Sequence, residues 1–164
     1  MGGEGNILIV DGTPIQTIID RITGCENVME EFPGIEVVGH QASKNDRATG
    51  LTVTTDMLTA TPDVQGIFGM NDPSALGAVL AVEQAGRADD IIVVGIDGSP
   101  EAVEELNRDG SPFVASATQN PAEMVRQAVA IAQQIVEGNP PEEKTVLIPS
   151  VIVTRDSVDE YAGW

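Results

Sequence analysis

The chain has 164 residues, a length that fits one domain with a substantial buried core. Eight basic side chains stand against 26 acidic ones, which gives a formal net charge of −18. Binding to a phosphate backbone needs clustered Lys and Arg, so this charge argues against a nucleic-acid partner. No apolar run approaches the roughly 18 residues of a membrane span, and we expect no membrane insertion.

The acidic residues are spread along the chain. This is typical of a solvated shell that keeps a protein dispersed, or of adaptation to a saline habitat. Cys25 is the only cysteine, which excludes an internal disulfide, and we expect it to be a small buried thiol. The first residues lack the basic and apolar regions of a signal peptide, so we expect a leader to be absent from this chain.

Short apolar runs alternate with longer amphipathic segments. The runs predict strands at residues 6–10, 35–39, 65–70, 91–96 and 113–117. The longer segments predict helices at about residues 15–32, 47–59, 72–86, 100–107 and 120–138. Connections of this length require a parallel sheet with helical crossovers. The predicted fold class is therefore α/β, with a three-layer parallel sheet in the flavodoxin-like strand order 2-1-3-4-5.

The stretch from Val64 to Gly77 shows the plan most clearly. A short apolar strand ends at Asn71, and a helix starts directly after it. Asp72 can cap this helix, and Pro73 fits its first position. We therefore expect Asn71 to lie at the tip of the strand and to point above the sheet.

A hydrogen-bonding side chain stands at or near the end of every predicted strand. These residues are Asp11, Gln41, Asn71, Asp97 and Gln119. The carboxyl ends of parallel strands meet at one edge of a sheet, and ligands bind beyond that edge. Each residue alone fits a loop or cap role. Together they favour a sugar, a polyol or another ligand with several hydroxyl groups.

Three strand-end signatures resemble a known family: Gly69–Gly77, Val93–Pro100 and Ala117–Pro121. They are similar to the carboxyl-terminal half of the ribose-binding-protein-like periplasmic sugar-binding proteins, the solute receptors of ABC importers, which have the type I periplasmic binding fold. The resemblance implies a sugar-binding lobe, a periplasmic or otherwise extracytoplasmic location, and an ABC permease as the partner of the full-length protein.

The resemblance also implies which residues bind the ligand. Family members hydrogen-bond sugar hydroxyls from the positions of Asn71, Asp97 and Gln119, and this chain keeps all three. We add Asp11, at the end of the first strand, to the expected site.

Two positions depart from the family pattern. An arginine often used against the ligand falls near Ile19, although Arg21 is close by and is included in the expected site. The aromatic residue that often stacks on the sugar corresponds to Asn45, which is also included. Loss of that ring weakens the case for a hexose or pentose in particular.

The resemblance covers one of two lobes. It assigns residues 1–119 to the carboxyl-terminal lobe, 120–143 to a helix that packs on the first lobe in the family, and 144–164 to a return segment and tail. The first lobe would precede Met1, so this chain alone is expected to bind weakly or not at all.

Without that lobe, we expect the helix at residues 120–138 to fold onto its own sheet. The alternative is that it packs against a second copy of the chain. In the own-sheet arrangement, an exposed apolar remnant would promote self-association.

Other function classes fit the sequence less well. His40 is the only histidine and is expected to lie in a loop, and the chain has no nucleophile elbow and no metal-ligand cluster. We therefore predict no catalytic residue, metal or cofactor. The serious alternative is the effector-binding core of a sugar-responsive LacI-type transcription repressor, which has the same lobes.

Tyr161 and Trp164 are expected to pack locally in a short helical tail.

Overall fold

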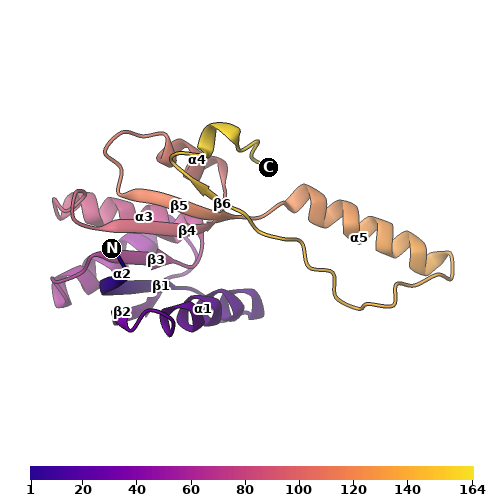
Figure 1. The fold of residues 1–164 in the computed structure, drawn as a ribbon, viewed down its shortest axis with the longest axis horizontal. Coiled ribbons are helices and arrows are strands. Elements are labelled where there is room, and N and C mark those ends of the chain that lie inside the picture. Colours follow the sequence, from indigo (N-terminus) through magenta and orange to yellow (C-terminus); the bar gives the residue numbers. More distant parts are fainter.

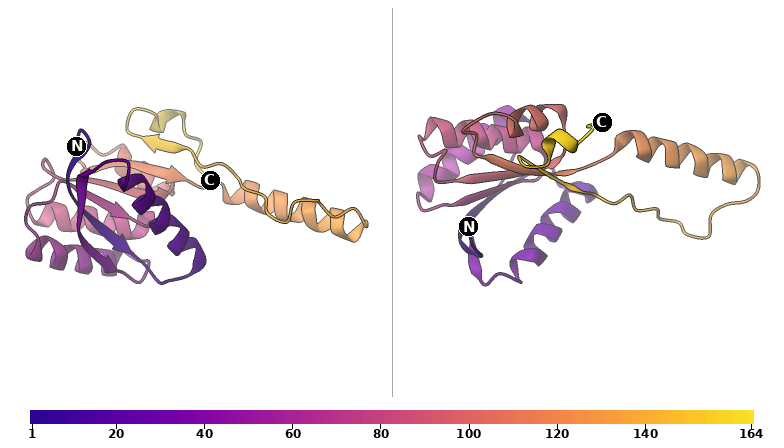
Figure 2. Two further views of the ribbon diagram at one scale, coloured as in Figure 1. Left: turned by 60° about the horizontal axis from the view of Figure 1, so that its bottom comes forward. Right: turned by 45° about the horizontal axis from the view of Figure 1, so that its top comes forward.

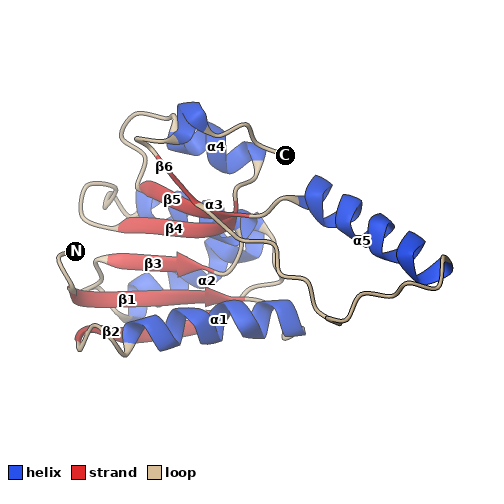
Figure 3. Cartoon of the chain, turned by 45° about the vertical axis from the view of Figure 1, so that its right-hand side comes forward, coloured by secondary structure: helices blue, strands red, loops and turns tan.

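A computed structural model describes all 164 residues. The chain forms a six-stranded sheet with the order β2-β1-β3-β4-β5-β6 (Figure 3). The strands are β1 (Glu4–Asp11), β2 (Gly34–Ala42), β3 (Gly66–Gly69), β4 (Ile92–Asp97), β5 (Phe113–Thr118) and β6 (Ile152–Thr154). The helices are α1 (Gln16–Met29), α2 (Arg47–Ala60), α3 (Asp72–Gln84), α4 (Pro100–Leu106) and α5 (Pro121–Val136), and a short 3-10 helix, η1, covers Val158–Glu160.

The predicted strand order is confirmed, because β1 to β5 are all parallel and lie in the order 2-1-3-4-5. The structure adds one strand that the sequence analysis did not predict. β6 pairs with β5 in the antiparallel direction and closes that edge of the sheet. β2 is also longer than predicted, so His40 lies within a strand and not in a loop.

The helices cover the two faces of the sheet unequally (Figures 1 and 3). α2, α3 and α4 pack over one face and enclose the larger core, a cluster of 19 buried residues that includes Leu8 and Val10. Ile9, which alternates with them on β1, points to the other face and packs with residues of α1. The apolar run of β1 is thus buried on both sides, as is typical of a central parallel strand.

α1 covers the second face only in part. Ile92 at the start of β4 remains 37% exposed, and Ile19 of α1 remains 45% exposed. Cys25 lies on the inner side of α1 beside the smaller core and is partly buried. Burial, with a smaller contribution from Glu26, raises the pKa of its thiol to about 11.

α5 does not fold onto the sheet, so the expected own-sheet arrangement is wrong. The helix begins at the carboxyl edge of the sheet and extends outward, away from the other elements (Figures 1 and 2). Its 16 residues reach about 24 Å, and none of them is buried. We call α5 together with the segment that follows it, up to residue 151, the arm. None of the helices is both long and apolar enough to cross a membrane.

The backbone at the start of α5 accounts for its direction. The N-cap residues of α1 to α4 all have extended conformations with ψ between 157° and 163°. Asn120, the N-cap of α5, has ψ 81°. This rotation aims α5 out of the lobe, although Asn120 caps the helix in the usual way by accepting a hydrogen bond from the Glu123 N–H.

The chain leaves the lobe and re-enters it at the same place. Thr118, the last residue of β5, donates its backbone N–H to the Val151 carbonyl at 2.7 Å. The Thr118 hydroxyl accepts from the Val151 N–H at 3.3 Å, and Ser150 donates its hydroxyl to the Thr118 carbonyl. The outgoing and returning strands are therefore held side by side at the base of the arm.

Candidate ligand-binding site

The structure brings the predicted residues to a common edge, which we call the rim. Asp11, Asn71, Asp97 and Gln119 stand at or just beyond the carboxyl ends of β1, β3, β4 and β5. These strands are neighbours in the sheet, so their ends form one continuous row. Gln41 near the end of β2 is exposed and makes none of the hydrogen bonds of the rim.

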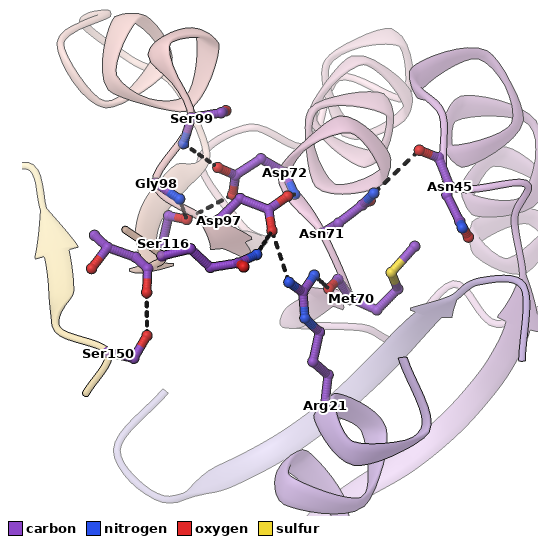
Figure 4. A network of polar contacts seen from close by, with 12 residues as sticks. Arg21, Asn45, Met70, Asn71, Asp72, Asp97, Gly98, Ser99, Ser116 and Ser150 are labelled. Atoms are coloured by element: carbon purple, nitrogen blue, oxygen red, sulfur yellow. Dashed lines mark hydrogen bonds and ion pairs between the residues drawn. The ribbon is translucent and has the colours of Figure 1, made fainter. Parts of the chain in front are cut away.

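Asp97 is the centre of the rim (Figure 4). One carboxylate oxygen, Oδ1, accepts hydrogen bonds from the Arg21 guanidinium at 2.9 Å and from the Gln119 side-chain amide. The second oxygen, Oδ2, faces the Asp72 backbone N–H at 3.4 Å. Arg21 uses a second nitrogen to donate to the Met70 carbonyl at 2.9 Å. Arg21, Asp97 and Gln119 therefore form one cluster that joins α1 to the ends of β3, β4 and β5.

Arg21 reaches the rim from α1, a helix that lies on the opposite face of the sheet from α2 and α3 (Figure 3). Its side chain is only 14% exposed, and that of Asp97 is 19% exposed. In a charge pair this shielded from water the attraction is stronger than at the surface, and removal of one partner would leave the other charge uncompensated. The sequence analysis included Arg21 by its nearness to the family position, and the structure shows its partner. Ile19, at the ungapped position itself, is exposed instead.

Asn71 has a local structural role as well as its place on the rim. Its side-chain oxygen accepts a hydrogen bond from the Ser74 N–H at 2.9 Å, so Asn71 is the N-cap of α3. The expectation that Asp72 caps this helix is wrong, because Asp72 lies inside the first turn and is completely buried. The Asn71 amide donates to the Asn45 carbonyl at 3.2 Å. Only one amide hydrogen of Asn71 is left for a ligand.

Asn45 and Asp11 extend the rim toward β2. Asn45 lies in the β2–α2 loop with a left-handed backbone, φ 67°, and its side-chain oxygen accepts from the Thr13 N–H at 2.8 Å. Asp11 accepts from the Gly12 N–H at 2.6 Å and pairs with the His40 ring at 3.0 Å. Asn45 therefore connects the end of β1 to Asn71, but Asp11 is engaged with its own neighbours.

The carboxyl-terminal tail contacts the same region, which the sequence analysis did not predict. Tyr161 donates its hydroxyl to the Gly98 carbonyl at 3.0 Å, and the indole N–H of Trp164 donates to the Asp97 carbonyl at 2.9 Å. Both residues thus pack against the turn that follows β4. No spacing in the sequence indicates this contact, because it depends on the path of the chain after β6.

A groove of about 440 Å³ lies next to the rim, between α5 and the returning part of the arm. It begins beside Gln119 and continues along apolar side chains of the arm. The lining residues are Thr118, Gln119, Asn120, Met124, Gln127, Ala128, Ile131, Val146, Leu147, Ile148, Pro149 and Ser150. Several apolar residues of the arm are strongly exposed, among them Val136 at 87% and Leu147 at 85%.

The rim offers both donors and acceptors to a ligand. The guanidinium and the side-chain amides can donate, and the carboxylates can accept. A hydroxyl group both donates and accepts, so a row of such side chains suits a molecule with several hydroxyls. Hydrogen bonds that involve a charged partner are also stronger than those between neutral groups.

Comparison with known proteins identifies the family. The family model described as "Periplasmic binding protein domain" matches residues 1–140. This chain belongs to that family. The ribose import binding protein RbsB of Bacillus subtilis (strain 168) is 30% identical over 156 residues, which are 94% of this chain and 49% of that protein.

Two solved structures show the same fold in this periplasmic binding protein family. An ABC transporter periplasmic solute binding protein from Actinobacillus succinogenes 130z with bound D-allose has a TM-score of 0.91 and 32% identity, covering 98% of this chain and 56% of that one. An ABC transporter solute binding protein from Bacillus halodurans C-125 with bound myo-inositol has a TM-score of 0.88 and 34% identity, covering 98% and 55%. The chain spans about half the length of these relatives.

Proposed function

We propose that this chain is one lobe of the solute-binding component of an ABC-type sugar importer. The observation that carries the proposal is the cluster of Arg21, Asp97 and Gln119 at the rim, with Asn71 beside it. It places charged and amide groups where the ligand of a parallel α/β sheet binds. The relatives named above are binding proteins, which favours binding over catalysis.

The ligand we propose is a sugar or polyol with several hydroxyl groups. D-allose, myo-inositol and ribose appear in the names of the related proteins, and all three present hydroxyls around a small frame. The rim carries no aromatic ring at Asn45, so the apolar face of a sugar would find no stacking partner there. We therefore expect hydrogen bonds from Asp97, Asn71 and Gln119 to contribute most of the binding energy.

We propose that residues 1–119 form the lobe, that residues 120–143 pack on a second lobe, and that residues 144–164 return and complete the sheet. The direction of α5 supports this division, because an apolar helix extended into water is stable only when another body covers it. The solved structure with bound D-allose supports this division too. It aligns with 98% of this chain, so the aligned part has to include the arm.

The full-length protein would then close two lobes around the ligand and deliver it to an ABC permease in the periplasm or at the outer face of the membrane. A rim with only one wall leaves much of a ligand in water. We therefore propose weak or absent binding by the chain alone. Neither the family model nor the relatives support the repressor core considered from the sequence.

The test is calorimetric titration with D-allose, myo-inositol and D-ribose. It compares the chain alone with the protein at the full length of its relatives. We expect saturable binding of at least one of these compounds only at full length, and a loss of at least tenfold in affinity in the Asp97→Asn variant. Glu104→Gln, on the exposed side of α4, is the matched control that removes one charge away from the rim and from the arm. Sub-micromolar binding by the chain alone, or unchanged affinity in Asp97→Asn, would contradict the proposal.

A further inference from the structure

Asp72 is a buried carboxylate that the proposed binding site does not use directly. It is the first residue of α3, it has no exposed surface, and none of the ion pairs of the chain includes it. Its Oδ1 accepts from the Ser116 hydroxyl at 2.7 Å and its Oδ2 accepts from the Ser99 N–H at 2.8 Å (Figure 4). Burial raises the pKa of this carboxyl, and the nearby Asp97 charge adds to the effect.

The turn between β4 and α4 has a strained backbone at the residue that forms the centre of the rim. Asp97 has φ 145°, a region that side chains other than glycine rarely adopt, and Gly98 follows with φ 66°. Such conformations persist only when the surroundings impose them. The strain is therefore informative: the contacts that hold this turn also determine where the Asp97 carboxylate lies.

Those contacts converge on Asp72. Ser99 donates its N–H to Asp72 directly, and Gly98 donates its N–H to the Ser116 hydroxyl at 3.0 Å, which in turn donates to Asp72. The Asp72 backbone N–H faces the Asp97 carboxylate at 3.4 Å. Asp97, Gly98 and Ser99, three consecutive residues of the turn, are thus all connected to Asp72, either through its side chain or through its backbone N–H.

The two contacts of the Asp72 side chain differ in what they require. The Ser99 N–H can only donate, whereas the Ser116 hydroxyl can also accept, so an asparagine can keep both contacts and only a variant without side-chain oxygens breaks both. The space is also closed, because a Cβ atom added at Gly95 would lie 2.5 Å from Asp72 Oδ1. Burial of this carboxyl group away from any cation is costly, and the hydrogen bonds from Ser99 and Ser116 offset part of the cost.

We propose that Asp72 is a positioning residue, whose carboxylate holds the β4–α4 turn in the strained conformation that presents Asp97 at the rim. The other side of the turn is held by Gln119 and Trp164, which donate to the Asp97 carbonyl, and by Tyr161, which donates to the Gly98 carbonyl. The inference rests on the proposed function in one respect, namely that Asp97 binds the ligand. The conformation of the turn itself can be measured without a ligand.

The experiment compares Asp72→Ala, which removes both side-chain oxygens, with the native chain by NMR and fluorescence. The three-bond coupling between HN and Hα of Asp97 is small at φ 145° and becomes large when the residue relaxes to an ordinary extended conformation. Trp164 is the only tryptophan, so its emission reports on its contact with the same turn. We expect the coupling to increase and the emission to shift to longer wavelength in Asp72→Ala.

Val79→Ala is the matched control, because it removes buried side-chain volume from the same helix without touching the turn. We expect it to leave both signals native. If Asp72→Ala does not fold, Ser116→Ala takes its place, since it removes only the link from Gly98 to Asp72. A folded Asp72→Ala or Ser116→Ala variant with both signals native would overturn the proposal. Failure of D-allose, myo-inositol and D-ribose to bind would affect the proposed function alone.

Discussion

Arg21 and Asp97, which are 76 positions apart in the sequence, form an ion pair of 2.9 Å at the carboxyl edge of the sheet. The pair joins the helix on one face of the sheet to the turn that leads to the other face. Because Arg21 also donates to the Met70 carbonyl, a single side chain connects three elements at the rim.

Removal of this arginine should destabilise the lobe. Arg21→Met keeps the apolar stem but leaves the shielded Asp97 carboxylate without its cation, and we expect a loss of about 2 kcal/mol in the free energy of unfolding. Urea denaturation measures it. Arg126→Met is the control, since its pair with Glu123 is exposed and should contribute less than about 1 kcal/mol. Equal losses in both variants would contradict the role of Arg21.

The two roles of Asn71 can be separated by substitution. Asn71→Ala removes the N-cap of α3 and should cost about 1 kcal/mol of stability. Asn71→Asp keeps an oxygen that can accept from the Ser74 N–H but removes the donor to the Asn45 carbonyl. We expect near-native thermal unfolding of Asn71→Asp and weaker ligand binding by the full-length protein. Native affinity in Asn71→Asp would show that the amide does not contact the ligand.

Asp72 should give the stability of the chain a recognisable pH dependence. The pKa of Asp72 is raised in the folded state from the ordinary 3.8. Between the unfolded and the folded pKa, the folded chain therefore keeps a proton that the unfolded chain has lost. The stability it contributes is complete below about pH 4 and is lost as the pH rises through the folded pKa. The free energy of unfolding of the native chain, relative to Asp72→Asn, should therefore fall over this range.

Asp46 provides a control for that measurement, because its contribution to stability should change with pH in the opposite direction. It accepts from the Thr49 N–H at the start of α2, and this hydrogen bond lowers its pKa. Relative to Asp46→Asn, the native chain should lose stability as the pH falls through the lowered pKa. The same trend in both comparisons would show that neither carboxyl produces it.

The exposed arm should make the isolated chain self-associate. Val129 on α5 is 62% exposed and belongs to the apolar stripe of the helix. We expect sedimentation velocity to detect oligomers whose population decreases in Val129→Lys. Gln133→Lys adds the same charge on the same helix and should leave the oligomers in place. A native chain that remains monomeric at high concentration would contradict this prediction.

Much of the fold could be predicted because local signals and the rules of parallel sheets agree. Apolar runs, helix caps and turn residues locate five strands and five helices, and the length of the crossovers determines that β1 to β5 are parallel. β6 has only three residues, and although its segment is β-branched it was assigned to the return segment, because its antiparallel pairing with β5 is not determined by a local pattern. The direction of α5 was predicted wrongly because it depends on the backbone angle at Asn120, to which composition and spacing are insensitive.

Part of the candidate site could also be predicted from the sequence, and part could not. The position of Asp97, Asn71 and Gln119 at one edge could be predicted, because the carboxyl ends of parallel strands meet there. The partner of Arg21 could not be predicted, because a contact between α1 and the end of β4 depends on how closely α1 packs on the sheet. The capping role of Asn71 was assigned to Asp72 for a related reason, since both are good capping residues and only the exact start of α3 distinguishes them.

The paired outgoing and returning strands at the base of the arm determine how any body attached to the arm can move. The hydrogen bonds between Thr118 and the segment at Ser150 and Val151 tie the two chains to each other. A body attached to α5 is therefore anchored to the lobe through two covalent connections at one point, and a change of its orientation has to involve both of them together.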